Sequence, residues 1–514
     1  MQLFFCADAL VIITIPTLLE FIYRQYVLLI YFFITLVLYC NFFYEQITNM
    51  SAVATPKKGH PKGLYLLFFT EMWERFSYYG MRAILIYYLT KTYIQGGLGM
   101  DKGEATLLYG YFTGLVYFTP LIGGWLADKY LGKRNAITIG GILMMIGQFV
   151  LFGVNTMPGL YAGLILLIIG NGFFKPNIST LVGGLYKEGD DRRDSAFSIF
   201  YMGINLGALI APLLIGYFTD NLFAVKEGTE IMSYGYKYGF LAAGIGMFLG
   251  QIAFNMLAPK YLGELGKKPI GAANSKDVVE DTESINPQTG KVLSKADEKQ
   301  RISVIFILFL FAVFFWAGFE QAGSSLSLYT DSYIDRKIGS FEVPSSWFQS
   351  VNPLFIVLLA PLFAMFWNSK FGKKLTTPVK MGVGMIILGL GFLFMLGAVG
   401  EREVQGNIDD INNKAAMMWL IMTYLFHTIG ELCLSPVGLS VVTKLSPPKL
   451  ASILMAVWML SSSAANFIGG YLAATVETLG AGEVFTYIAL FVMVCGGLLI
   501  LLNKFIVRMM HGVR

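Results

Sequence analysis

Long apolar segments alternate with short polar ones along most of the chain. From residue 63 onward, twelve segments approach or exceed the roughly 20 apolar residues that a helix needs to cross a bilayer. They occupy residues 63–94, 104–127, 135–156, 158–185, 195–220, 235–258, 302–330, 346–368, 378–400, 416–444, 449–475 and 483–508. The pattern therefore predicts an all-α polytopic membrane protein with twelve core helices.

The polar stretch 259–301 divides these helices into two sets of six. Its mixed Lys, Glu and Asp residues do not suit hydrocarbon, so we expect an N-terminal bundle at 50–258, a cytoplasmic linker at 259–301 and a C-terminal bundle at 302–514. The loops after the second, fourth, eighth and tenth helices are basic, whereas loops 157–159 and 479–482 lack Lys and Arg. This bias predicts cytoplasmic ends for the twelve-helix core in a cytoplasmic (inner) membrane.

Residues 1–49 contain two further apolar stretches, at roughly 3–22 and 26–44, with Arg24 as their only basic residue. They lack the small-residue cleavage site of a secretory signal peptide. Met50 then begins a polar, basic run that is typical of an ordinary protein start. Two interpretations remain open: a mis-assigned upstream start, or an extra helical pair that would preserve the orientation of the core.

The composition excludes several classes of function. Of the 514 residues 55% are hydrophobic and 14% are charged, whereas about a quarter of a soluble domain is charged. The net charge of +5 is concentrated in loops and offers no nucleic-acid surface. Glycine motifs for nucleotide phosphates are absent, and the four cysteines lack metal-binding spacing. We expect no cofactor, no metal and no enzyme activity, so uphill transport would draw on an ion gradient.

Polar residues of the first helix lie on one stripe. Glu71, Glu74, Arg75, Tyr78 and Arg82 fall within one arc of about 100°. Each ionisable group at the bilayer centre costs about 2.5 to 3.5 kcal/mol, so the stripe is expected to face a water-filled cavity or a partner. A structural ion pair between Glu71 and Arg75 would leave Glu74 and Arg82 unexplained.

Other helices carry matching charges. Lys175 precedes Pro176 in the fourth helix, Glu431 precedes Pro436 in the tenth, and Glu320 lies in the seventh. Proline bends a helix, and bent helices at equivalent positions of two halves indicate a midplane site. The predicted buried charges are four acids and three bases: Glu71, Glu74, Glu320 and Glu431 against Arg75, Arg82 and Lys175. One carboxylate is therefore left without a basic partner and could exchange a proton. Opposite charges on the two halves suit a substrate that carries both, such as an amino acid or a short peptide.

The loop after the second helix contains Asp128, Gly132, Lys133 and Arg134 in the run "GGWLADKYLGKRNA". The chemistry allows two interpretations. The charges form a latch with neighbouring helices that breaks as the transporter opens inward, or they only determine the membrane topology.

These motifs resemble those of a known family. The runs "EMWERFSYYG", "GNGFFKPNIS", "FSIFYMGINLGALIAP", "FWAGFEQAGSS" and "GELCLSPVGLS" resemble signatures of the proton-dependent oligopeptide transporter (POT) family, and the loop resembles a motif of the major facilitator superfamily. The resemblance covers residues 63–514. It implies a fold of two six-helix bundles and a symporter that uses protons to move di- and tripeptides by rocker-switch alternating access.

The resemblance also implies roles for individual residues. For the peptide it implies Arg75, Tyr79, Tyr117 and Lys175 at the carboxylate, Asn205, Asn352 and Glu431 at the amino terminus, and Trp316 and Trp458 at the side chains. For coupling it implies protonation of Glu71 and Glu74 beside Arg75, an outer ion pair of Arg82 with Glu320, and an inner pair of Lys175 with Glu431. Ordinary packing is the alternative for Tyr117, Trp316 and Trp458.

The second helix lacks the histidine of animal relatives, which favours carboxylates as proton carriers, and His427 is predicted to serve in packing or hydrogen bonding. A transporter of another small solute, such as nitrate or an amino-acid derivative, and a peptide sensor that does not transport remain alternatives. We expect the protein to act as a monomer whose partners are a di- or tripeptide, protons and the lipid bilayer.

Overall fold

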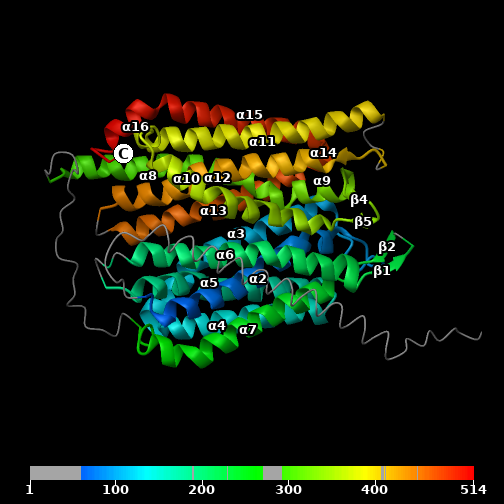
Figure 1. Ribbon diagram of the computed structural model, residues 1–514, viewed down its shortest axis with the longest axis horizontal. Coiled ribbons are helices and arrows are strands. Elements are labelled where there is room, and N and C mark those ends of the chain that lie inside the picture. The colour runs from blue at the N-terminus through cyan, green and yellow to red at the C-terminus, as the bar shows by residue number, and fades with distance from the viewer. Residues whose placement is uncertain are drawn as a thin grey trace, which may run out of the picture. The chain divides into compact units, whose positions relative to one another are not determined.

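The computed structural model describes residues 59–187, 190, 192–228, 230–269, 292–406, 410, 412–447 and 450–513. Residues 61–514 form one compact unit. The predicted extension at 1–49 lies outside the described residues. Figure 1 shows long, nearly parallel helices, with α11 and α15 at one side of the unit and α4 and α7 at the other.

The described part of the N-terminal half contains six long helices. They are α2 (Lys62–Thr90), α3 (Lys102–Leu126), α4 (Lys133–Gly153), α5 (Met157–Gly184), α6 (Arg192–Tyr217) and α7 (Tyr236–Leu262). Short π-helical turns, η1 (Ala127–Leu131) and η2 (Phe218–Leu222), extend α3 and α6. Strands β1 (Val225–Glu227) and β2 (Glu230–Ser233) pair antiparallel before α7.

The C-terminal half has a similar number of long helices and more short pieces. Its helices are α8 (Lys295–Phe319), α9 (Ser325–Tyr333), α10 (Val351–Asn368), α11 (Thr377–Gln405), α12 (Met417–Leu445), α13 (Ala451–Ala474), α14 (Val476–Leu479), α15 (Ala481–Leu501) and α16 (Asn503–Met509). The 3₁₀ turns are η4 (Glu320–Gly323), η5 (Ser345–Ser350) and η6 (Gly372–Lys374). Strand β3 (Ile334–Asp335) pairs parallel with β6 (Ala415–Ala416), and β4 (Lys337–Ile338) pairs antiparallel with β5 (Phe341–Glu342).

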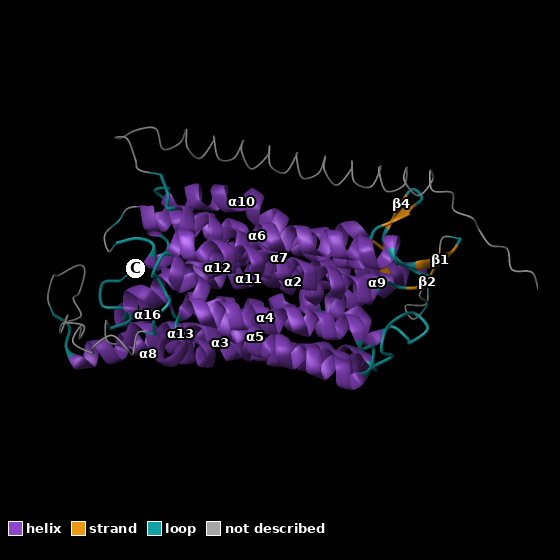
Figure 2. Cartoon of the chain, turned by 90° about the horizontal axis from the view of Figure 1, so that it is seen from below, coloured by secondary structure: helices purple, strands orange, loops and turns teal. Residues whose placement is uncertain are grey.

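The strands and α9 gather at one end of the helices, whereas α16 lies at the opposite end (Figures 1 and 2). Among the described residues, 11 helical stretches are long and apolar enough to cross a membrane. The helix α2, with 29 residues, completes the predicted set of twelve and carries the charged stripe. The predicted all-α polytopic architecture is therefore confirmed.

Several helix boundaries differ from the prediction, and three of the differences lie in the C-terminal half. Helix α8 begins at Lys295, before the predicted residue 302, because a capping box of Ser294 and Asp297 stabilises its polar first turn. The seventh predicted helix is interrupted by η4 at Glu320, and the twelfth ends at Leu501 before α16. Helix therefore occupies both ends of the predicted linker, while the division into domains at 259–301 stays a prediction.

The two halves meet most closely where α3 crosses α13. A Cβ atom at Gly110 would lie 2.7 Å from the Cα atom of Gly470, so only glycine allows this approach. At the same crossing, Ser463 Oγ donates a hydrogen bond of 2.8 Å to the carbonyl oxygen of Gly114. This contact places the helices that carry the site residues side by side across the two halves.

Candidate substrate cavity

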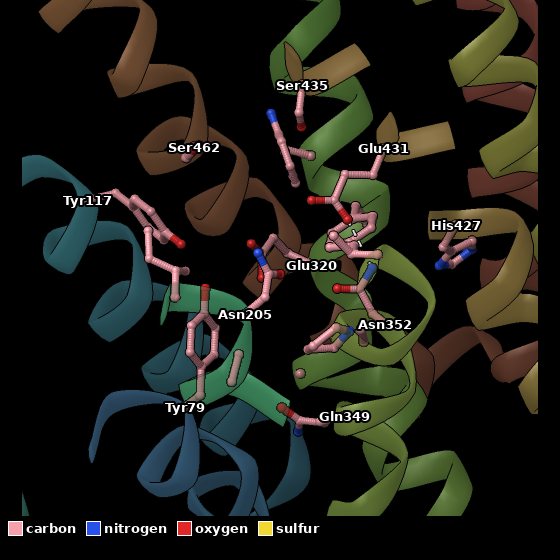
Figure 3. Close-up of a pocket in the computed structure, with 18 of the residues that line it drawn as sticks. Tyr79, Tyr117, Asn205, Glu320, Gln349, Asn352, His427, Glu431, Ser435 and Ser462 are labelled. Atoms are coloured by element: carbon pink, nitrogen blue, oxygen red, sulfur yellow. Dashed lines mark hydrogen bonds between the residues drawn. The ribbon is translucent and has the colours of Figure 1, made fainter. Parts of the chain in front are cut away.

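A cavity of about 350 Å³ lies between the two halves and takes its walls from helices of both. The lining includes ten of the predicted site residues: Tyr79, Arg82, Tyr117, Lys175, Asn205, Trp316, Glu320, Asn352, Glu431 and Trp458. Figure 3 shows Tyr79 and Tyr117 on one side and Asn352, Glu431 and His427 on the other. The fold thus brings to one cavity residues that are separated by hundreds of positions in the sequence.

Glu431 provides a negative charge on the C-terminal side. Asn352 Nδ2 donates hydrogen bonds of 2.9 Å to Glu431 Oε2 and 3.0 Å to Thr428 Oγ1. Within the described part of the chain, no basic side chain forms a salt bridge with Glu431 within 4.0 Å. The carboxylate is therefore oriented by an amide and available to a cation in the cavity.

Lys175 provides a positive charge on the N-terminal side. Its Nζ lies 4.1 Å from the centroid of the Tyr117 ring, a cation–π geometry. No salt bridge within 4.0 Å joins Lys175 to a carboxylate of the described residues. The predicted inner pair of Lys175 with Glu431 is thus not formed in this conformation, and its role in gating stays a prediction.

Arg82 and Glu320 both line the cavity and pair across the two halves. The Arg82 guanidinium pairs with the Glu320 carboxylate, and Arg82 Nε donates a hydrogen bond of 2.6 Å to Tyr109 Oη. Both charged side chains are almost buried. The structure therefore contains the predicted ion pair between the halves, while its gating role remains a prediction.

A second ion pair between the halves lies just after the end of α2. Lys91 Nζ lies 2.5 Å from Asp331 Oδ2, and Ser345 Oγ donates a hydrogen bond of 2.9 Å to Asp331 Oδ1. Arg336 approaches Asp331 Oδ1 at 3.6 Å. The sequence did not indicate this pair, because its members lie near the polar ends of helices, where charges are common. Only their contact across the halves distinguishes them.

The other charges of α2 are not part of the cavity wall. Arg75 Nε lies 3.1 Å from Glu71 Oε1, and the guanidinium also pairs with Glu74. All three side chains are buried, and none belongs to the cavity lining in this conformation. The stripe is expected to face a cavity or a partner, and for these three residues the structure shows the partner: they pair with one another and lie away from the cavity. Their predicted roles in peptide binding and protonation remain predictions.

The loop motif packs within the N-terminal half. Gly132 has a φ of +77°, a left-handed conformation that favours glycine. Asp128 Oδ1 lies 3.8 Å from Lys133 Nζ, and Arg134 Nη1 donates a hydrogen bond of 2.8 Å to the carbonyl oxygen of Gly263. These contacts organise the turn after α3, and the proposed latch remains a prediction.

Aromatic residues complete the cavity wall. Trp316 stacks edge to face on Phe319 at 5.1 Å, and Trp458 is almost buried. The His427 ring lies 4.7 Å from the Phe392 ring, and neither of its nitrogens has a hydrogen-bond partner among the described residues. The lining also includes Tyr201, which the sequence analysis missed because tyrosines are abundant in this chain.

Comparison with known proteins identifies the family. The sequence profile of the POT family matches residues 134–269 and 272–487. The chain is 41% identical over 510 residues to the transporter YclF of Bacillus subtilis (strain 168), covering 91% of this chain and 99% of that protein. It is 33% identical over 504 residues to the di-/tripeptide transporter of Lactococcus lactis subsp. cremoris, covering 89% and 98% of the two chains.

Solved structures agree with this result. A crystal structure of a POT peptide transporter in complex with alafosfalin superposes with a TM-score of 0.76 at 36% identity, over 88% of this chain and 97% of that chain. A POT family transporter in complex with 5-aminolevulinic acid gives a TM-score of 0.76 at 32% identity, over 88% and 98%. The profile match, the full-length relatives and the shared fold show that this chain belongs to the POT family, whose members are multi-pass membrane transporters.

Proposed function

We propose that the protein imports di- and tripeptides across the inner membrane together with protons. The observation that carries this proposal is the pair of opposite charges in the cavity, Lys175 from one half and Glu431 from the other, neither with an ionic partner among the described residues. A short peptide carries a carboxylate and an ammonium group and would neutralise both. The charged ends are common to all short peptides, so this recognition does not depend on their side chains.

The dimensions support a small substrate. An extended chain spans at most about 3.3 to 3.6 Å per residue, so a tripeptide reaches roughly 10 Å. The cavity of about 350 Å³ lies in the lower part of the range of about 300 to 1,000 Å³ that is usual for small-molecule sites. Trp316 and Trp458 offer broad apolar surfaces to side chains of different shapes. The charged ends would select for length, while the aromatic walls tolerate different sequences.

The charge balance supports proton coupling. Glu71, Glu74 and Arg75 form one buried cluster, and Arg82 pairs with Glu320. With Lys175 and Glu431 included, four acids oppose three bases. A zwitterionic peptide adds no net charge, so one proton on a carboxylate would neutralise the buried groups. Glu71 and Glu74 are the proposed carriers, because they share a single arginine.

The contacts between the halves support an inward-facing conformation. In the described residues, the hydrogen bonds and ion pairs between the halves run from Gly114 and Ser463 near the cavity to Lys91 and Asp331 at the end that carries the strands. None joins the ends that carry the basic loops. If those loops are cytoplasmic, as proposed from their charge, the outer side is closed, and rocking of the halves would break the outer contacts.

The test is uptake of labelled dialanine into liposomes that contain the purified full-length protein, with and without an inward proton gradient. We expect gradient-driven accumulation that unlabelled dialanine blocks and free alanine does not. N-acetyl-dialanine and dialanine amide, which each lack one charged end, should compete poorly. Binding without accumulation would favour the sensor, and no binding would refute the peptide assignment.

Variants test the two charges separately. Glu431→Gln should lose the preference for dialanine over N-acetyl-dialanine, and Lys175→Met should lose the preference over dialanine amide. Lys237→Met is the matched control, because Lys237 is exposed on α7 and is not part of the cavity lining. A variant that loses both preferences equally would contradict the assigned orientation of the peptide.

A further inference from the structure

Asn171 is a buried amide in the middle of α5, one helical turn before Lys175. Close helix contacts hold its backbone in place. A Cβ atom at Gly172 would lie 2.8 Å from Thr119 Cβ on α3, and a Cβ atom at Gly170 would lie 2.6 Å from the carbonyl oxygen of Gly140 on α4. Because the backbone is held on both sides of Asn171, only its side chain is free to reorient.

The Asn171 side chain reaches the acidic cluster of α2. Its Nδ2 donates a hydrogen bond of 3.3 Å to Glu74 Oε1, while the Arg75 guanidinium pairs with Glu74 Oε2. Its own Oδ1 is buried and has no hydrogen-bond partner among the described residues. The amide therefore donates to the carboxylate through Nδ2, while Oδ1 stays unpaired. Burying an unpaired polar atom costs free energy, so this arrangement needs an explanation.

The two edges of an amide suit the two states of a carboxyl group. Ionised Glu74 accepts hydrogen bonds only, and the Nδ2 donor of Asn171 matches it. Because Arg75 occupies Oε2, a proton on Glu74 is best placed on Oε1, where it would face the Nδ2 donor. A half-turn of the amide then presents Oδ1, which accepts the new O–H. Each state has one hydrogen bond between these two side chains and one unpaired amide atom.

We infer that Asn171 is a positioning residue that detects protonation of Glu74 by turning its amide and so links the proton to the substrate site. The inference rests on the proposed function, in which Glu74 carries a proton. Asn171 and Lys175 lie on adjacent turns of α5. A rotation of the Asn171 amide therefore takes place one helical turn from the Lys175 ammonium group, which is proposed to bind the peptide carboxylate. The charged and titratable groups around this site are Glu71 and Arg75 on α2, Lys175 on α5, and Tyr79 and Tyr117 near Arg75.

A merely structural amide would behave differently, and the chain offers one for comparison. Gln148 on α4 is fully buried, and its Nε2 donates hydrogen bonds of 3.3 Å to the backbone oxygen and the Oγ of Ser77 on α2. It therefore resembles Asn171 in burial and in contacting α2, but its partners carry no titratable proton in the physiological range. Gln148→Leu is thus the matched control for Asn171→Leu.

The experiment combines infrared difference spectroscopy with transport in liposomes of the full-length protein. Acidification should produce a carboxylic acid C=O band that is absent in Glu74→Gln, which assigns it to Glu74. In Asn171→Leu we expect this band to shift, because the protonated Glu74 loses its hydrogen-bond acceptor. We also expect the ratio of gradient-driven accumulation to peptide exchange to fall about tenfold, which is the effect of losing one hydrogen bond to a charged group. Gln148→Leu should change neither.

The outcomes separate this inference from the proposed function. A Glu74 band that is unmoved in Asn171→Leu would overturn the role of Asn171 and leave proton coupling intact. Absence of any Glu74 band would overturn the inference alone, because Glu71 could still carry the proton, whereas absence of gradient-driven accumulation in the natural protein would overturn both. If Asn171→Leu does not fold, Asn171→Thr provides the same test, because its shorter hydroxyl does not reach Glu74 and the band must shift likewise.

Discussion

The ion pair of Lys91 with Asp331 joins the two halves at the end that carries the strands, which is the outer end in the proposed orientation, and it predicts how tightly that end is closed. The perturbation is Lys91→Met, which removes a charge from the N-terminal half and keeps a long, unbranched side chain that is one atom shorter. Because the pair joins two halves that must separate for the outer side to open, its loss should favour the outward-open state. The closed end would remain joined by the ion pair of Arg82 with Glu320.

The structure allows a magnitude to be worked out. The two charges lie 2.5 Å apart, with 22% of the Lys91 side chain and 14% of the Asp331 side chain exposed. Their attraction is about 7 kcal/mol at an effective dielectric constant of about 20, but desolvation offsets most of it. Hydrogen bonds to charged groups contribute a net of about 1.5 to 3 kcal/mol.

The neighbouring arginine decides where in this range each variant falls. In Lys91→Met, Asp331 keeps Arg336 at 3.6 Å, so we expect about 1.5 kcal/mol, or roughly a tenfold shift toward the outward-open state. In Asp331→Asn, Lys91 loses its carboxylate, while Arg336 keeps Glu342 at 2.8 Å. The effect should therefore approach about 3 kcal/mol.

The assay is the distance distribution between spin labels on opposite halves at the outer end. Ile94 and Ile338 are 84% and 61% exposed and suit labelling after substitution by cysteine, in a chain whose 4 native cysteines are replaced. The control is Lys226→Met, because Lys226 bonds Asn221 within one half. An unchanged distribution in Lys91→Met, or strictly additive effects of Lys91→Met and Asp331→Asn, would refute the reasoning.

Three further predictions follow from the site. Glu74→Gln should abolish accumulation driven by a proton gradient while part of the exchange of labelled for unlabelled peptide persists, and full accumulation would contradict the proton role. Glu431→Gln should raise the KM for dialanine about tenfold or more, since it removes the charge that meets the ammonium group; an unchanged KM in a concentration series would exclude this contact. Gly110→Val should prevent the close approach to Gly470, cost about 1 to 3 kcal/mol in the outer-closed state and lower the melting temperature, whereas an equally stable variant would show that the crossing is not tight.

The sequence was sufficient for the architecture because the relevant forces are local. A bilayer penalises each exposed backbone group, so any stretch of about 20 apolar residues has to form a helix. The same penalty identified Lys175, Glu320 and Glu431 as unusual and therefore as candidates for a site. It did not reveal the break at Glu320, because the 3₁₀ turn leaves no mark in the hydropathy.

Local sequence patterns did not show which charged residues pair with one another. Arg82 and Glu320 are 238 positions apart, and Lys91 and Asp331 are 240 apart. Whether such residues meet depends on how helices rotate and cross. The family resemblance supplied the first pair, and nothing in the sequence pointed to the second.

The clearest division concerns α2. Its sequence alone determined that Glu71, Glu74, Arg75 and Arg82 share one face of a helix, because the spacing of a helix is regular. Only the tertiary structure decided that Arg82 reaches the cavity while the other three are covered, since neighbouring helices pack over the first turns of the stripe and leave its last turn open. Periodicity specifies which side chains share a face, and packing between distant segments specifies what that face meets.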